Sequence, residues 1–96
     1  MSDVISLGDV LVSEECKLEW NIKENKKRIG CKSWERMEYY IGSKNVGEYL
    51  NCMNEVKGVS KDEIKKLKDD LKYDYKKGFL SVVDRFDFKS KKVIKI

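Results

Sequence analysis

Five lysines between residues 61 and 77 are spaced so that they fall on one side of a helix. The intervals between them are four, three, four and four residues, which matches the period of an α-helix. A row of ammonium groups can contact phosphate oxygens, and each lysine does so as a point charge. The row consists of Lys61, Lys65, Lys68, Lys72 and Lys76.

The same stretch also holds four aspartates, Asp62, Asp69, Asp70 and Asp74, whose charges would repel a phosphate. It contains no Arg, Asn or Gln that could make bidentate contacts with base edges. The lysine row therefore has two interpretations. It is either a phosphate-binding surface with little sequence preference or an ordinary solvated helix face.

A second group of cations gathers in residues 23–36, beside an aromatic residue. No acidic residue lies between Lys26 and Lys32, so we expect this segment to contribute more to phosphate binding than the helix lysines, whose field the aspartates offset. Trp34 could stack on a base, but its helical spacing with Met37 favours a place in the core. The alternative for the cations is an exposed hairpin tip. The group consists of Lys23, Lys26, Lys27, Arg28, Lys32 and Arg36.

A third group of lysines, Lys89, Lys91, Lys92 and Lys95, lies near the end of the sequence. In a terminal hairpin these lysines could contact backbone phosphates. They could equally protect an edge strand from pairing with another chain. The sequence favours neither interpretation.

Three helices are expected to position these groups. Ser33 can cap a helix over residues 34–41, and a second helix is expected over residues 46–56. A third helix is predicted over residues 61–77, because Ser60 and Glu63 have capping-box spacing and Gly78 can end the helix.

Strands are expected on both sides of the helices. Residues 16–23 alternate strictly between apolar and polar side chains, which indicates a half-buried strand, and residues 27–31 could form a short return strand after a turn. Residues 1–15 could form a short strand or a docked arm. At the other end, we expect a strand over residues 79–88 with a break near Asp84, a turn over residues 89–92 and a last strand over residues 93–96.

The apolar positions of these elements predict one hydrophobic core. Tyr49 is expected at its edge. The core residues expected are Leu18, Trp20, Ile22, Trp34, Met37, Ile41, Leu50, Ile64, Leu67, Leu71 and Phe79.

From residue 33 onwards the order of elements, three helices followed by a hairpin, resembles that of a winged helix. The apolar positions Val46, Leu50, Val59, Ile64 and Leu71 match core positions of such folds. The resemblance implies that the helix over residues 61–77 and the hairpin tip meet DNA. We therefore expect a single α+β domain over residues 1–96, with an N-terminal strand or hairpin (1–32), a helical part (33–77) and a C-terminal hairpin (78–96).

Composition argues against several other classes of protein. The chain has 96 residues and a formal net charge of +4, and it contains no His. Cys16, Cys31 and Cys52 are odd in number and too far apart for a zinc site, so we expect free thiols, no metal and no cofactor. Without an imidazole base, a phosphate-binding glycine loop or convergent carboxylates, we expect no catalytic residues. No segment has the character of a signal peptide or a membrane span, so a soluble intracellular protein is expected.

Two hypotheses about function remain. The first is a non-enzymatic protein that binds DNA or RNA through phosphate contacts. Ala, Pro, Thr, Gln and His are absent while Lys, Ile and Asn are common, which suggests an AT-rich genome and an accessory protein of a virus or mobile element. The second is a structural or inhibitory protein that binds another protein through its five tyrosines. The sequence indicates no oligomeric state. The residues expected to bind nucleic acid are Lys26, Lys27, Arg28, Lys32, Arg36, Lys61, Lys65, Lys68, Lys72, Lys91 and Lys92.

Overall fold

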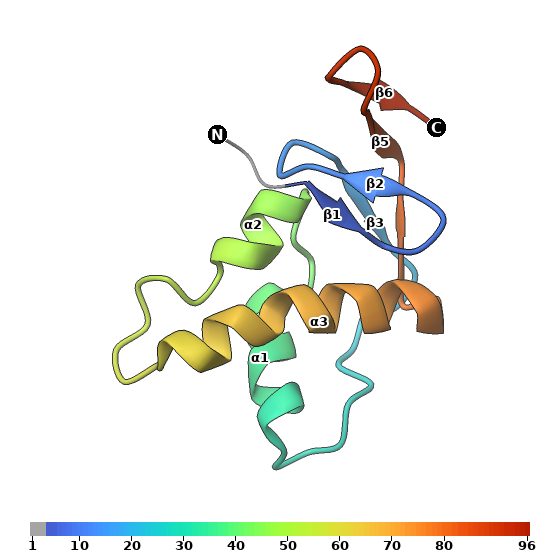
Figure 1. The fold of residues 1–96 in the computed structure, drawn as a ribbon. Helices are drawn as coiled ribbons and strands as arrows, with labels where there is room; N and C mark the ends of the chain where they lie inside the picture. Colours follow the sequence, from blue (N-terminus) through green and yellow to red (C-terminus); the bar gives the residue numbers. More distant parts are fainter. Residues whose placement is uncertain (1–3) are drawn as a thin grey trace.

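Within residues 4–96, which the computed structural model describes, the chain forms three helices and six short strands (Figure 1). The helices are α1 (Lys32–Tyr40), α2 (Val46–Asn51) and α3 (Lys61–Lys77). The strands are β1 (Ile5–Ser6), β2 (Leu11–Val12), β3 (Leu18–Trp20), β4 (Leu80–Val82), β5 (Asp84–Asp87) and β6 (Lys92–Lys95). The predicted α+β class, with N-terminal strands and a C-terminal hairpin, is confirmed.

Helix α3 has the bounds and caps that the sequence predicts. The Ser60 side chain accepts a hydrogen bond from the Glu63 amide at 3.3 Å, and Gly78 ends the helix at φ 80°, where a glycine is favoured. Leu67 and Leu71 are fully buried in the core. Two aspartates, Asp70 and Asp74, lie on the same buried face, which the sequence did not lead us to expect.

Strand β3 forms inside the predicted segment 16–23 but covers only Leu18–Trp20, and its partner is a distant segment. Leu18 and Trp20 face inward and pair with Val82 and Leu80 of strand β4, whereas residues 27–31 form no strand. The predicted return strand is therefore wrong. The N-terminal hairpin that does form pairs β1 with β2, and the first three residues of the predicted arm lie outside the described residues.

Helices α1 and α2 differ from the prediction at their ends. Cys31, not Ser33, caps α1, because its sulfur accepts a hydrogen bond from the Trp34 amide at 3.4 Å while the Ser33 hydroxyl accepts one from Arg36. Helix α2 ends at Asn51 and a series of turns follows it. The link from α2 to α3 is therefore longer than the turn of about three or four residues in a helix-turn-helix.

The core lies between the helices and the N-terminal strands. Tyr40 and Tyr49 are fully enclosed, their rings stack at 3.9 Å, and both rings lie about 6 Å from Trp20. Tyr49 is therefore central to the core and not at its edge. Of the predicted core, Leu18, Met37, Leu67 and Leu71 are buried, whereas Trp20, Ile22, Trp34, Ile41, Leu50, Ile64 and Phe79 are partly buried.

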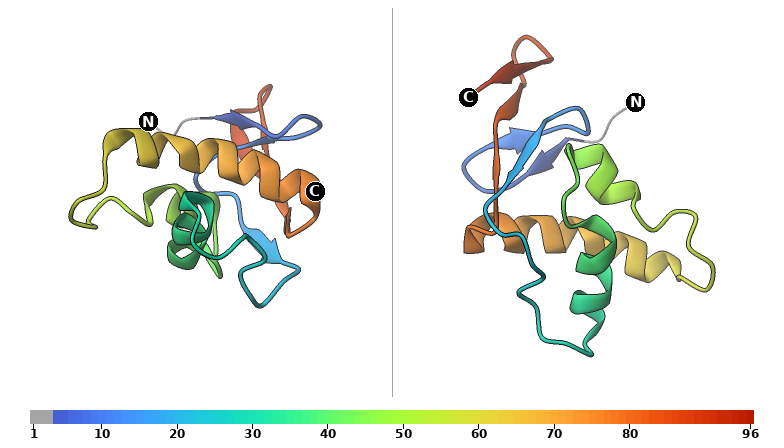
Figure 2. Two further views of the ribbon diagram at one scale, coloured as in Figure 1. Left: turned by 90° about the horizontal axis from the view of Figure 1, so that it is seen from below. Right: turned by 180° about the vertical axis from the view of Figure 1, so that it is seen from behind.

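The C-terminal hairpin, β5 and β6, stands at one end of the molecule. Figures 1 and 2 show it beyond the N-terminal strands, whereas α1 and the loop before it lie at the opposite end, with α3 between. The molecule measures 42 × 27 × 20 Å, and its radius of gyration of 13.1 Å is typical of a compact chain of about 100 residues.

Candidate nucleic-acid interface

The C-terminal hairpin is held by regular pairing of β5 with β6. Asp84 pairs with Lys95, Phe86 with Val93, and Asp87 with Lys92. Two of these three cross-strand pairs join opposite charges, which stabilises antiparallel strands. The predicted break near Asp84 is present. Strand β4 ends at Val82 beside β3, and the chain continues as β5, which pairs with β6.

The turn of this hairpin is fixed by Asp87. Its carboxylate accepts a hydrogen bond from the Ser90 hydroxyl at 2.7 Å and another from the Ser90 amide at 3.3 Å. These bonds from Ser90 hold the pKa of Asp87 below its ordinary value. The Lys91 amide donates to the Asp87 carbonyl at 2.7 Å, and Lys91 itself has φ 57°. The tip is thus ordered by its own hydrogen bonds.

The tip of the hairpin presents a hydrophobic ring among cations. Phe88 is 66% exposed, the Lys91 ammonium lies 5.8 Å from the centre of its ring, and Lys89, Lys91, Lys92 and Lys95 are all exposed. Residues 88–96 contain these four lysines and no acidic residue. The other 17 basic residues of the chain are balanced by its 17 acidic residues, so the net charge of +4 equals the charge of this segment.

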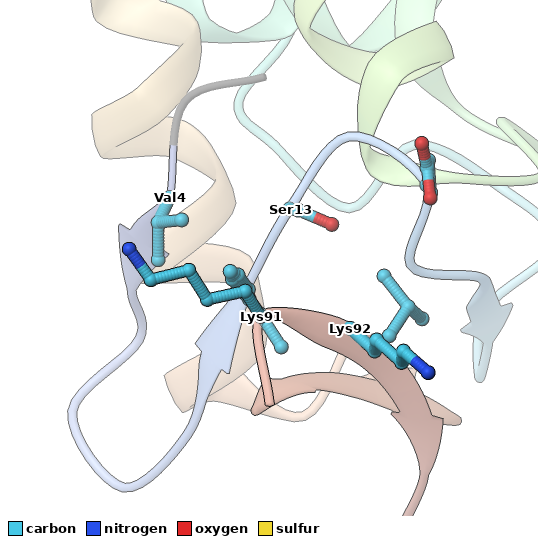
Figure 3. A pocket seen from close by; sticks show the side chains of 7 residues that line it. Val4, Ser13, Lys91 and Lys92 are labelled. Carbon is cyan, nitrogen blue, oxygen red and sulfur yellow. The ribbon is translucent and has the colours of Figure 1, made fainter. Parts of the chain in front are cut away.

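A groove of about 430 Å³ lies between the hairpin and the N-terminal segment, lined by Val4, Ser13, Glu15, Phe86, Lys91, Lys92 and Val93. Figure 3 shows the Lys91 side chain extending toward Val4, Lys92 pointing to the other side, and the Ser13 hydroxyl between them. The groove offers two cations to an anion, with the carboxylate of Glu15 as the opposing charge. Ser13 itself is buried, and its hydroxyl lies 3.8 Å from the Cys16 sulfur.

Two cations of the segment at residues 26–36 are bound inside the protein. The Lys27 ammonium lies 2.8 Å from Asp74, and the Lys27 side chain is only 9% exposed. Arg36 makes a bidentate contact with Asp70 and a further contact with Glu63 at 2.7 Å. We expected both residues to contact nucleic acid, but the structure places their cationic groups against carboxylates of α3, of which Asp70 and Asp74 are buried.

The three remaining cations of this segment, Lys26, Arg28 and Lys32, are exposed. Lys26 and Arg28 line a pocket of about 380 Å³ together with Asp69 and Asp70 of α3. We expected no carboxylate to offset the positive charge of this segment. This is wrong, because carboxylates that are distant in the sequence lie near it in the fold. The segment also lies at the opposite end of the molecule from the hairpin, so the two basic groups do not form one surface (Figure 1).

The lysines of α3 are exposed along one side of the helix, as expected for Lys61, Lys65, Lys68, Lys72 and Lys76. Of the four aspartates of the helix, Asp70 and Asp74 point into the protein, whereas Asp62 and Asp69 stay exposed. The negative charge beside the lysine row is therefore smaller than the sequence suggests.

The polar cluster around Asp74 was not predicted from the sequence. Asp74 accepts hydrogen bonds from the hydroxyls of Tyr40 and Tyr49, both at 2.7 Å, in addition to its ion pair with Lys27. Arg36 and Tyr40 are four residues apart on α1, and Asp70 and Asp74 are four apart on α3, so each pair lies on one helix face. This matched spacing of four residues was the one signal in the sequence from which a contact between α1 and α3 could have been predicted. The cluster holds the fold together and offers no open site.

None of the three thiols, Cys16, Cys31 and Cys52, forms a disulfide; Cys16 is buried and the other two are partly exposed. Over residues 4–96, no group of three or more His, Cys, Asp and Glu side chains is placed to hold a metal ion. No helix in the same range combines the length and the apolar character that a bilayer span needs.

Comparison of the chain with protein-family models, with curated proteins and with solved structures finds no match. We therefore infer function from the geometry and charge of this chain alone.

Proposed function

We propose that the protein is a non-enzymatic nucleic-acid-binding protein whose main contact surface is the tip of the C-terminal hairpin. The observation that carries the proposal is the segregation of charge. Residues 88–96 hold four exposed lysines and no acid, whereas the rest of the chain is balanced. The acids of the hairpin, Asp84 and Asp87, pair across the strands with Lys95 and Lys92. Lys89 and Lys91 lie at the projecting turn, where they can reach the phosphates of a polynucleotide.

The α3 lysines form a second, weaker part of the proposed surface. They are exposed, and half of the aspartates that would oppose them are buried in the core. Asp62 and Asp69 still flank the row, so its field is partly cancelled at physiological salt, where the Debye length is about 8 Å. Lys26, Arg28 and Lys32 contribute least in this proposal, because Asp69 lines the same pocket as the first two and because the other two cations of the segment, Lys27 and Arg36, are bound to buried aspartates.

The expected binding is largely independent of base sequence. The exposed cations of the hairpin tip are all lysines, which act as point charges and lack the planar fork that reads a guanine edge. An accessory role inside a cell, for a virus or a mobile element, is part of the same proposal.

The test is a titration of fluorescently labelled DNA and RNA oligonucleotides with the protein, followed by anisotropy at several salt concentrations. We expect binding whose affinity falls linearly with salt on a double logarithmic scale, because cations are released from the nucleic acid. Absence of binding at about 50 mM salt, where such contacts are strong, would contradict the proposal.

A surface beside α1 supports the alternative, a protein partner. Tyr39 is 50% exposed and lines a pocket of about 330 Å³ with Trp34, Glu35 and Glu38. Tyr40 and Tyr49 are fully buried, so only part of the tyrosine set remains for an interface. Sedimentation of wild type and Tyr39→Ser over a range of concentrations tests self-association through this surface. Loss of association in the variant would favour the alternative.

A further inference from the structure

Phe88 is the one large apolar side chain among the lysines of the hairpin tip, within residues 88–92. It lies just after β5, it is 66% exposed, and the hairpin does not use it for pairing, since Phe86 and Val93 supply the apolar cross-strand pair. Such exposure of an aromatic ring beside cations is typical of a surface on which bases stack.

The position of Lys91 adds a second contact for the same ligand. Its ammonium lies over one face of the Phe88 ring, 5.8 Å from the ring centre. A base that stacks on this face would displace the ammonium, and the flexible lysine side chain would keep the ammonium near the phosphate of the same nucleotide. One nucleotide can therefore place its base on the ring and its phosphate against the ammonium.

The hydrogen bonds of the turn fix the backbone that carries Phe88 before any ligand arrives. Asp87 binds both the amide and the hydroxyl of Ser90, and the Lys91 amide returns to the Asp87 carbonyl. The backbone on both sides of Phe88 is thus fixed, which lowers the entropy lost on binding.

We infer that Phe88 is a stacking platform for an unpaired base, so that the ligand is single-stranded or locally unpaired nucleic acid. This inference rests on the proposed function and adds the class of ligand to it. In a duplex the bases already stack on one another, so the ring could contact them only at an end or by prising a step apart. A single strand exposes the face of every base.

An anionic membrane surface is the main rival ligand, because lysines and an aromatic ring also suit the headgroup region. The two are separated by the probe. A single-stranded oligodeoxythymidine presents phosphates and free bases, an abasic oligonucleotide of equal length presents phosphates alone, and vesicles containing phosphatidylserine present an anionic bilayer.

The experiment compares wild type with Phe88→Ala, Phe88→Tyr and the double change Lys91→Gln with Lys92→Gln. We expect Phe88→Ala to weaken binding to oligodeoxythymidine about tenfold, within the range found for stacked bases, and Phe88→Tyr to restore it. Binding to a duplex and to the abasic oligonucleotide should change little with Phe88→Ala. The double lysine change should weaken binding to oligodeoxythymidine, to the duplex and to the abasic oligonucleotide. Circular dichroism should show that each variant is folded.

Three outcomes would overturn the inference. If wild type and Phe88→Ala bind oligodeoxythymidine equally, the stacking platform is wrong while the proposed function stands. If Phe88→Ala weakens duplex binding as much as single-strand binding, the ring does not select unpaired bases. If wild type binds the vesicles and none of the oligonucleotides, the proposed function fails together with the inference.

Discussion

The Lys27 ammonium lies 2.8 Å from Oδ1 of Asp74, whose side chain is completely enclosed. Oδ1 makes the ion pair with Lys27, whereas Oδ2 accepts the hydroxyl hydrogens of Tyr40 and Tyr49. One carboxylate on α3 therefore ties together the loop before α1, α1 itself and α2. A buried charge of this kind is tolerable only while its partners remain.

Replacing Lys27 should destabilise the fold much more than replacing its neighbour Lys26. Lys27→Met leaves Asp74 as an uncompensated buried charge, which costs about 3 kcal/mol. Lys26→Met removes an exposed cation and should change the free energy of unfolding by no more than about 0.5 kcal/mol. Urea unfolding of the two variants measures the difference. Equal stabilities would show that the ion pair contributes nothing to the fold.

The protein should lose stability in alkaline solution because of its two buried tyrosines. Burial, with a further contribution from the charge of Asp74, raises the pKa of Tyr40 and of Tyr49 above the ordinary value. A raised pKa gives stability that is complete below the unfolded pKa of about 10 and falls as the pH rises beyond it. Spectrophotometric titration should show fewer than five tyrosines ionising before the unfolding transition. Reversible ionisation of all five in the folded protein would contradict this.

Arg36 should be irreplaceable by lysine, although the charge is kept. Its guanidinium spans Asp70 and Glu63, and an ammonium group cannot make the same fork. We expect Arg36→Lys to cost about 2 kcal/mol, and Arg28→Lys, at an exposed position, to cost little. Thermal unfolding checks both variants, and a fully stable Arg36→Lys would contradict the prediction.

The same contact predicts a loss of stability in acid. The hydrogen bond from Arg36 holds the pKa of Glu63 below its ordinary value. A lowered pKa gives stability that is present above the unfolded value and is lost as the pH falls through the folded one. Glu63→Gln should therefore reduce the acid dependence of the unfolding free energy below the ordinary glutamate pKa of about 4.3. An unchanged pH profile would contradict the role of this pair.

The three thiols should differ in their reactivity toward iodoacetamide. Cys16 is buried, and burial raises the pKa of Cys52 to about 11, so we expect Cys31 to react first in the native protein. After denaturation without reductant, mass spectrometry should find three labelled thiols. Recovery of an intramolecular disulfide, or of zinc bound in the native protein, would contradict the prediction of free thiols.

Features that depend on neighbours in the sequence could be predicted. Helix α3 follows from the Ser60 cap, the apolar period and Gly78, and strand β3 follows from its alternation. The partner of β3 could not be predicted, because β4 lies some sixty residues away and neither segment contains a local sequence pattern that identifies its partner.

The candidate site was harder to predict, because it depends on which charges meet in space. Lys26 and Lys27 are adjacent in the sequence, yet one is exposed and the other reaches a buried aspartate. Periodicity placed Asp74 on α3, but its charge suggested a solvated position. The lysines of the hairpin tip were identified, whereas Phe88 was missed because a lone aromatic beside a strand is indistinguishable from a core residue.

Three matched triple variants test most directly whether the hairpin tip binds nucleic acid. Each variant neutralises three exposed cations by changing them to Gln. The first changes Lys89, Lys91 and Lys92 of the tip, the second Lys61, Lys65 and Lys72 of α3, and the third Lys26, Arg28 and Lys32 before and at the start of α1. All three keep the ion pairs of Lys27 and Arg36, and thermal unfolding should confirm that each is folded.

The measurement is the slope of log affinity against log salt for a labelled oligonucleotide. Each lost phosphate contact lowers the magnitude of this slope by about one. We expect the tip variant to bind most weakly and to lose up to about three units of slope, the α3 variant to change less, and the third variant to change least. If the tip variant keeps the affinity and slope of wild type while either of the other two loses them, the hairpin is not the contact surface.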